Sequence, residues 1–140
     1  FLTVNFTGNF DGRATNFILG HHPDGKYFFV PWDYDKTFLP DGRTLRIMNA
    51  LSARAWRTMP EFQDSVKSRW QALRENGAAL DEAVLMDRVS RASDLLSPYM
   101  PFEYDLLGYP TELVYENEVE VLRQRIREHL AFMDAWLLSK

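Results

Sequence analysis

The sequence has 140 residues, a formal net charge of −4 and no cysteine. Its length is that of one domain, and 46% hydrophobic residues are enough to build a buried core. The acidic balance argues against non-specific nucleic-acid binding, which needs a basic surface. The lack of cysteine excludes a disulfide scaffold and a Cys-ligated zinc site. No apolar run approaches the roughly 18 residues of a membrane span, so none is predicted.

The first half of the chain predicts a β-hairpin. After residues 1–8, whose apolar and β-branched composition favours a strand or a loop, two runs rich in aromatic and β-branched residues follow. These runs, Phe17–Gly20 and Lys26–Trp32, are typical of strands. Between them, Pro23 presets a turn dihedral and Asp24-Gly25 supplies a left-handed position.

Polar residues flank this hairpin on both sides. Asn9, Asp11 and Asn16 precede the first strand, and Asp33 and Asp35 follow the second. Antiparallel strands place the start of one strand beside the end of the next. We therefore expect Asp11, Asn16 and Asp33 to converge at one end of the hairpin. Carboxylate and carboxamide oxygens suit hard cations such as Mg²⁺, Mn²⁺ or Ca²⁺.

Residues 35–44, DKTFLPDGRT, are predicted to form a loop because they contain Pro40 and Asp41-Gly42. An EF-hand calcium site is excluded in this region. Phe38 and Thr44 occupy the positions at which that motif needs Gly and Glu.

The spacing of the polar residues is that of a kinase catalytic loop. In protein kinases an Asp is followed five positions later by an Asn, and a second Asp beyond a strand pair holds the metal. Asp11 and Asn16 have the first spacing, and Asp33 follows the hairpin.

The segments N-F-D-G-R-A-T-N and P-W-D-Y-D resemble the spore-coat protein H (CotH) kinase family, whose signature is N-x-D-x-x-x-x-N followed by P-W-D-x-D. The resemblance implies that Asp11 is the catalytic aspartate. It implies that Asn16 and Asp33 bind the metal–nucleotide cofactor, with Asp35 as a further metal ligand. It also implies Mg²⁺ or Mn²⁺ and ATP as cofactors, a protein serine or threonine as acceptor, and a location outside the cell or on the spore or cell surface.

The resemblance further implies an α+β fold: a mainly helical C-lobe of an atypical kinase-like protein, with the hairpin carrying the acidic site. A kinase also needs a phosphate-covering loop and a lysine that pairs with the nucleotide phosphates, and both ordinarily precede the catalytic loop. Only ten residues precede Asp11, and no G-x-G-x-x-G occurs. We therefore expect a C-terminal part of a longer protein that is inactive, or nearly so, by itself. By the same resemblance, residues 1–8 would be the tail of a helix.

From Leu45 onward apolar residues recur at helical spacing. A single domain is expected, with residues 1–44 forming the site and residues 45–140 a helical subdomain. The predicted helices run from Leu45 to Arg57, from Pro60 to the Asn76-Gly77 stop, from an Asp81 cap to Pro98, and from a Thr111 cap to Leu137. Residues 99–110, punctuated by Pro and Gly, are predicted to be an ordered loop.

Several polar residues are left outside the predicted site. His21 and His22 are expected to be solvated turn residues, and His129 a surface residue of the last helix. Three arginines of that helix alternate with glutamates, a pattern typical of a solvated face with ion pairs. These arginines are Arg123, Arg125 and Arg127.

Two other functions remain open. The chain could be a degenerate metal-binding or structural module of a larger surface protein. It could also be a helical interaction domain, in which case Asp11 and Asp33 would lie apart. An apolar face left exposed by a missing N-terminal lobe would favour self-association of the chain.

Overall fold

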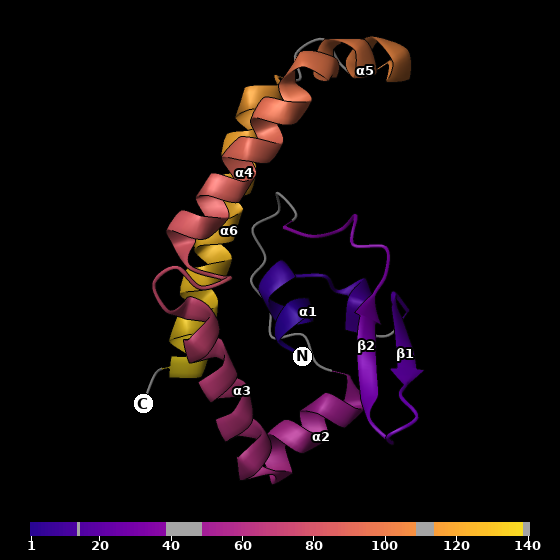
Figure 1. The fold of residues 1–140 in the computed structure, drawn as a ribbon, viewed down its shortest axis with the longest axis vertical. Helices are drawn as coiled ribbons and strands as arrows, with labels where there is room; N and C mark the ends of the chain where they lie inside the picture. Colours follow the sequence, from indigo (N-terminus) through magenta and orange to yellow (C-terminus); the bar gives the residue numbers. More distant parts are fainter. Residues whose placement is uncertain (14, 39–48, 109–113, 139–140) are drawn as a thin grey trace.

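The computed structural model describes residues 1–13, 15–38, 49–108 and 114–138. Helices dominate the described residues, and one two-stranded antiparallel sheet lies beside them (Figure 1). This confirms the predicted α+β class. The elements are α1 Leu2–Thr7, the 3₁₀ turn η1 Asp11–Arg13, β1 Phe17–His21, β2 Tyr27–Pro31, α2 Ala50–Thr58, α3 Pro60–Arg74, α4 Glu82–Leu96, η2 Ser97–Tyr99, α5 Met100–Leu107 and α6 Tyr115–Leu138.

The N-terminal segment is helical, which decides between the alternatives that propensity and resemblance left open. Helix α1 ends at Gly8, whose φ of 67° is the left-handed conformation of a glycine helix cap. Val4, Asn5 and Phe6 of α1 are buried. The short helix therefore packs as part of the core and places the following loop on its surface.

The hydrophobic core lies between α1, α3 and α6. Trp70 of α3 and Met133 of α6 are completely buried at its centre. The indole Nε1–H of Trp70 donates to Asp134 Oδ1 at 2.8 Å, and Arg74 pairs with the same carboxylate at 3.1 Å. This ties α3 to α6 by a polar contact beside the apolar one. The core cluster consists of Phe6, Val66, Trp70, Ile126, Leu130, Met133, Trp136 and Leu137.

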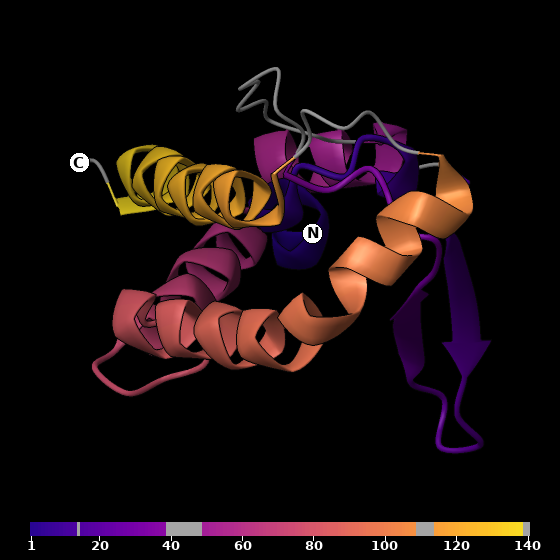
Figure 2. The same ribbon diagram turned by 90° about the horizontal axis from the view of Figure 1, so that it is seen from above.

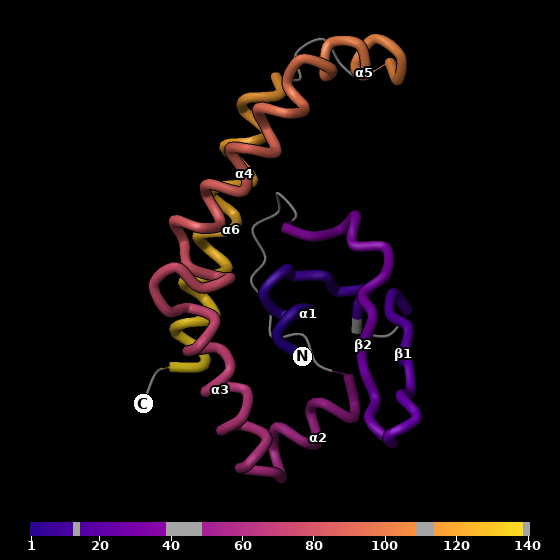
Figure 3. The backbone as a smooth tube through the Cα atoms, in the orientation of Figure 1, coloured from indigo at the N-terminus to yellow at the C-terminus, as the bar shows by residue number. Residues whose placement is uncertain are grey.

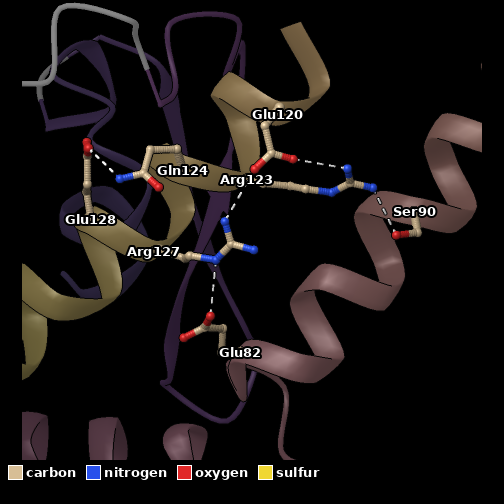
Figure 4. Close-up of polar contacts among 7 residues, drawn as sticks. All are labelled: Glu82, Ser90, Glu120, Arg123, Gln124, Arg127 and Glu128. Atoms are coloured by element: carbon tan, nitrogen blue, oxygen red, sulfur yellow. Dashed lines mark hydrogen bonds and ion pairs between the residues drawn. The ribbon is translucent and has the colours of Figure 1, made fainter. Parts of the chain in front are cut away.

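Helices α4 and α6 run side by side along the length of the molecule (Figures 1 and 2). Arg123 Nη2 donates to Ser90 Oγ at 3.0 Å, and Arg127 Nε donates to Glu82 Oε1 at 3.2 Å (Figure 4). Two of the arginines assigned to a solvated face therefore join α6 to α4. Arg125 makes an ion pair within α6. None of the helices in the described ranges is both long and apolar enough to cross a membrane.

Two predicted helix boundaries are confirmed by side-chain caps or proline. Asp81 Oδ1 accepts from the N–H of Val84 at 3.2 Å, and Pro60 opens α3. Helix α2 begins at Ala50, because Asn49 is its cap and accepts from Ser52 N–H at 2.8 Å. The predicted start at Leu45 lies outside the described residues. So do the Pro40 and Asp41-Gly42 turn signals, the EF-hand position of Thr44 and the Thr111 cap.

The prediction of a loop over residues 99–110 is wrong for its first part, because Met100–Leu107 form helix α5. Proline was taken as a helix breaker, yet Pro101 lies in the first turn, where its missing N–H has no intrahelical role. Gly108, with φ 65°, ends the helix. The proline and glycine signals were those of helix ends.

The hairpin is confirmed, and it stands at the side of the helical body (Figures 1 and 2). Phe17 pairs with Pro31 and His21 with Tyr27. His21 and His22 are exposed at the turn, as predicted, and His22 Nδ1 lies 3.0 Å from Asp24 Oδ1. The site end of the hairpin is therefore the opposite end, next to α1.

Candidate functional site

The loop between α1 and β1 is organised by Asn9 and Asp11. Asn9 is fully buried, and its Oδ1 accepts from Gly12 N–H at 3.2 Å. The carbonyl of Asp11 accepts from the N–H groups of Thr15 at 3.0 Å and Asn16 at 3.2 Å. These bonds close the loop and fix the backbone of Asn16 relative to Asp11.

The hairpin brings the second half of the site to this loop. Trp32 N–H donates to the carbonyl of Asn16 at 3.2 Å, which continues the register of the ladder by one pair. The side-chain Nδ2 of Asn16 donates to the backbone carbonyl of Asp33 at 3.1 Å and lies 3.5 Å from its Oδ2. The predicted convergence of Asn16 and Asp33 is therefore confirmed, although 17 positions separate them.

Asp33 has an unusual backbone conformation. Its φ of 53° is left-handed, and Phe38 is the other non-glycine residue of the described ranges with positive φ. Asp and Asn enter this region more readily than other non-glycine residues. The conformation turns the chain directly after the strand and leaves the Asp33 side chain exposed beside Asn16.

Lys36 contacts Asp11, and the sequence did not predict this contact. Its Nζ lies 3.3 Å from Asp11 Oδ2, so the segment after the hairpin meets the loop before it a second time. Both side chains are open to solvent, 61% for Lys36 and 38% for Asp11. The signal that could have found Lys36 was its place three residues beyond Asp33, in the segment predicted to return to the catalytic loop.

Asp35 is exposed, and within the described residues no hydrogen bond or ion pair joins it to another side chain. Across the same ranges, no three His, Cys, Asp or Glu side chains gather closely enough to hold a metal ion. The donors that the fold brings together are thus Asn16 with Asp33, and Asp11 with Lys36.

The site segment is anchored back onto the core at Phe38. Its N–H donates to the carbonyl of Thr7 at 2.9 Å, and its ring packs against Phe6 and His129 at centroid distances of 5.4 and 5.2 Å. Figure 3 shows the segment after β2 passing close to α1. The loop and the returning segment therefore share one support.

The prediction that His129 is a surface residue is wrong. Its side chain is 3% exposed, and Nδ1 lies 2.8 Å from the carbonyl of Phe6, which the neutral ring satisfies as a donor. Burial lowers the pKa of His129, although the Phe6 carbonyl and Glu128 act in the opposite direction. A Cβ on Gly8 would lie 2.5 Å from this ring. His129 therefore supports the end of α1 from which the site loop starts.

The donor chemistry at Asn16 and Asp33 fits a hard divalent cation. Mg²⁺ often takes only one or two protein carboxylates and completes its shell with water and substrate phosphates. A rotation of the Asn16 carboxamide exchanges the nitrogen that now faces Asp33 Oδ2 for an oxygen ligand. Two oxygen donors from separate segments are then available, which matches the sparse protein ligation typical of Mg²⁺.

Comparison with known proteins places the chain in a family. A search of curated proteins and a search of solved structures each found no match. The family model described as CotH kinase protein matches residues 1–133, nearly the whole chain. The match includes the loop, the hairpin and most of α6. The chain belongs to the CotH kinase family.

Proposed function

We propose that the chain carries the catalytic-loop and metal-binding half of a protein kinase, which transfers the γ-phosphoryl group of ATP to a protein serine or threonine. One observation carries the proposal. The hairpin joins Asn16 to Asp33 at the same loop in which Asp11 is exposed beside Lys36. Family membership supports a kinase-like activity.

Asp11 is the proposed catalytic base. Its carboxylate is reachable by a substrate, and its backbone is fixed by the two hydrogen bonds to its carbonyl. In the proposed step the acceptor oxygen forms a bond to the γ-phosphorus, and the bond from phosphorus to the bridging oxygen of ADP breaks. The hydroxyl proton passes to Asp11. Positioning and charge neutralisation supply most of the rate enhancement in such reactions.

Asn16 and Asp33 are the proposed holders of the Mg²⁺ or Mn²⁺ ions that accompany ATP, with Asp35 as a further ligand from the same exposed segment. Bound cations would neutralise charge on the nucleotide phosphates. The chain's own part is to present a carboxamide and a carboxylate at fixed separation, which the 3.2 Å backbone bond from Trp32 N–H to the Asn16 carbonyl provides whichever way the carboxamide is turned.

Lys36 is proposed to bind the transferred phosphoryl group. In the chain as it stands, its ammonium group pairs with Asp11 at 3.3 Å. An exposed pair of this kind contributes little to stability, typically about 0–1 kcal/mol. A phosphoryl oxygen arriving beside Asp11 would offer the ammonium group a stronger anionic partner. The lysine would then leave the carboxylate free to accept the hydroxyl proton.

The proposal is tested by calorimetric titration of ATP, with saturating Mg²⁺ or Mn²⁺, into the full-length protein that contains this chain. Metal-dependent binding is expected for the wild type and is expected to be lost in Asp33→Asn. Asp24→Asn, at the opposite end of the hairpin, is the matched control and should bind as the wild type does. Equal binding with and without metal, or equal binding by Asp33→Asn, would refute the proposed metal site.

The second candidate is a degenerate, structural member of the family. The absence of a three-residue His, Cys, Asp or Glu cluster in the described ranges is the observation that favours it. This candidate predicts that no ATP binds the folded chain at any metal concentration. The same titration therefore separates the two.

A further inference from the structure

The most informative feature outside the donors named above is a pair of buried polar atoms above Gly12. Within the described residues, Asn9 Nδ2 and Tyr34 Oη are buried side-chain atoms that have no hydrogen-bond partner. Buried polar atoms are nearly always paired, because leaving one unpaired costs its hydration free energy. Two such atoms from opposite sides of the hairpin call for a physical explanation.

Both atoms face the same small space. A Cβ added to Gly12 would lie 3.0 Å from Tyr34 Oη and 3.2 Å from Asn9 Nδ2. The carboxamide oxygen of Asn9 is already hydrogen-bonded to this loop, because Oδ1 accepts from the N–H of Gly12 at 3.2 Å. Gly12 itself is buried and directly follows Asp11, while Tyr34 directly follows Asp33. The shared space therefore lies between the residues that directly follow Asp11 and Asp33 in the sequence.

We propose that Tyr34 is a positioning residue, whose hydroxyl and the Asn9 carboxamide form a polar lock over Gly12 that holds Asp11 in place relative to Asp33. The inference rests on the proposed function for its catalytic meaning. The amide group of Asn9 donates to one shared water molecule, which in turn donates to the tyrosine oxygen, since the two side-chain atoms make no direct hydrogen bond. Gly12 is required because any larger side chain would fill the space between the two groups.

Tyr34 acts through its neighbours, since its hydroxyl is buried against the loop and turned away from solvent. Without this lock, the loop and the returning segment remain joined by the Trp32–Asn16 and Phe38–Thr7 backbone bonds and by two side-chain contacts. These side-chain contacts, Asn16–Asp33 and Asp11–Lys36, are partly or fully exposed. Exposed contacts hold a geometry loosely. The lock is the buried side-chain contact that would fix the position of Asp11 relative to Asp33.

Amide hydrogen exchange by NMR tests the lock without reference to ATP. In Tyr34→Phe the ring stays and only the hydroxyl is lost, so the core should remain folded. We expect exchange of the Gly12 and Asn16 amides to become about fivefold to tenfold faster, the effect of losing one buried hydrogen bond. Amides of α3 around Trp70 should be unchanged. Tyr27→Phe, at an exposed tyrosine of the hairpin, is the matched control and should leave every rate unchanged.

The variant Gly12→Ala provides a second test of the lock by hydrogen exchange. Its Cβ should displace the Tyr34 hydroxyl and accelerate the same amides. In the double variant with Tyr34→Phe, the missing oxygen makes room for the methyl group, so the two effects should be strongly non-additive. Additive effects, or unchanged exchange in Tyr34→Phe, would overturn the lock.

The affinity for Mg²⁺–ATP, measured by calorimetry on the same variants, tests the positioning role. We expect Tyr34→Phe to weaken binding about fivefold to tenfold while Tyr27→Phe leaves it unchanged. If the wild type binds no ATP, the proposed function fails, and the exchange rates still decide whether the lock exists. If exchange changes but affinity does not, the lock is structural and the positioning role is refuted.

Discussion

At the scale of single residues, the site depends on a backbone conformation that few side chains accept. Asp33 turns the chain with φ 53° and keeps its carboxylate exposed beside Asn16. The left-handed region costs an ordinary L-residue about 1–2 kcal/mol, and Asp and Asn tolerate it best. The same residue therefore supplies the turn and a donor, so a substitution there tests two properties unless the replacement is chosen to separate them.

The backbone contribution of Asp33 is measured by comparing two variants. Asp33→Ala should unfold at lower urea concentration than Asp33→Asn, with a difference of about 1 kcal/mol in the free energy of unfolding, because Asn accepts the left-handed conformation and Ala does not. The same pair of substitutions at Asp35, which has no positive φ, should differ by much less. Equal stability of the two Asp33 variants would contradict a strained turn at this position.

His129 gives the protein a dependence on pH near neutrality. Burial lowers the pKa of its folded-state imidazole, so the unfolded chain binds a proton first as the pH falls. The stabilisation is complete above the unfolded pKa of about 6.5 and is lost progressively below it. We expect the free energy of unfolding to fall by up to about 1.4 kcal/mol per pH unit in this window. Urea unfolding between about pH 5 and pH 7 measures it.

His129→Gln should remove most of this slope, whatever its effect on absolute stability. His22→Gln is the control, because His22 is exposed at the hairpin turn and should leave the slope in place. The carboxylates with lowered pKa, Asp81 and Glu128, act at more acidic pH and do not produce the slope. A slope that survives in His129→Gln would contradict its assignment to His129.

Some contacts of single residues could be predicted from the sequence, and others could not. The contact between Asn16 and Asp33 was predicted correctly because motif spacing and strand pairing are local properties. Lys36 and Tyr34 were missed because their roles depend on how the segment after β2 folds back on the loop. His129 was misassigned because it is buried by α1, more than a hundred residues away, whereas the two residues before it in the sequence, Arg127 and Glu128, are charged.

At the scale of elements, α2 and α4 start at a side-chain cap, and α3 and α5 start with a proline in the first turn. Asp81 caps α4 through Val84 N–H and also accepts from Gly77 N–H at 3.2 Å, so it closes the α3–α4 connection. These two hydrogen bonds lower the pKa of its carboxyl group. Such caps are visible in sequence because they use few residues at fixed spacing. Helix α5 was missed because the same prolines that permit a first turn also resemble loop punctuation.

The cap predicts a measurable loss of stability. Asp81→Ala should lower the free energy of unfolding by about 1 kcal/mol, within the range of about 0.5–2 kcal/mol known for N-cap removal. Asp87→Ala is the matched control on the same helix, since it removes only an exposed ion pair with Arg91 and should change stability by less than about 0.5 kcal/mol. Urea unfolding measures both. Similar losses in the two variants would show that the Asp81 cap stabilises the protein no more than an exposed ion pair does.

At the scale of the whole molecule, the hairpin is largely uncovered. Both of its faces are apolar, and Leu19 is 59% and Phe28 51% exposed on adjacent strands. A two-stranded hairpin is marginally stable in water unless its faces are covered. Large exposed apolar patches of this kind promote association. The sequence predicted the hairpin but not its exposure, because burial depends on which helices reach it.

We therefore expect the chain to self-associate through the hairpin in a concentration-dependent manner. Sedimentation velocity should show the effect, and the double variant Leu19→Lys/Phe28→Lys, with one charge on each face, should be monomeric. Leu51→Lys, at a 77% exposed position of α2, should associate like the wild type. A wild-type chain that stays monomeric at every concentration would contradict this expectation.

In the proposed function, the loop before the hairpin and the segment after it form one divalent-metal site. The most direct test is paramagnetic broadening of NMR signals by Mn²⁺ in the presence of ATP. We expect selective broadening of the Asn16 side-chain amide and of the exposed Trp32 indole next to Asp33. The signals of α5 should remain sharp. The broadening should disappear in Asp33→Asn and persist in Asp24→Asn. Uniform broadening, or broadening that Asp33→Asn leaves unchanged, would contradict the site.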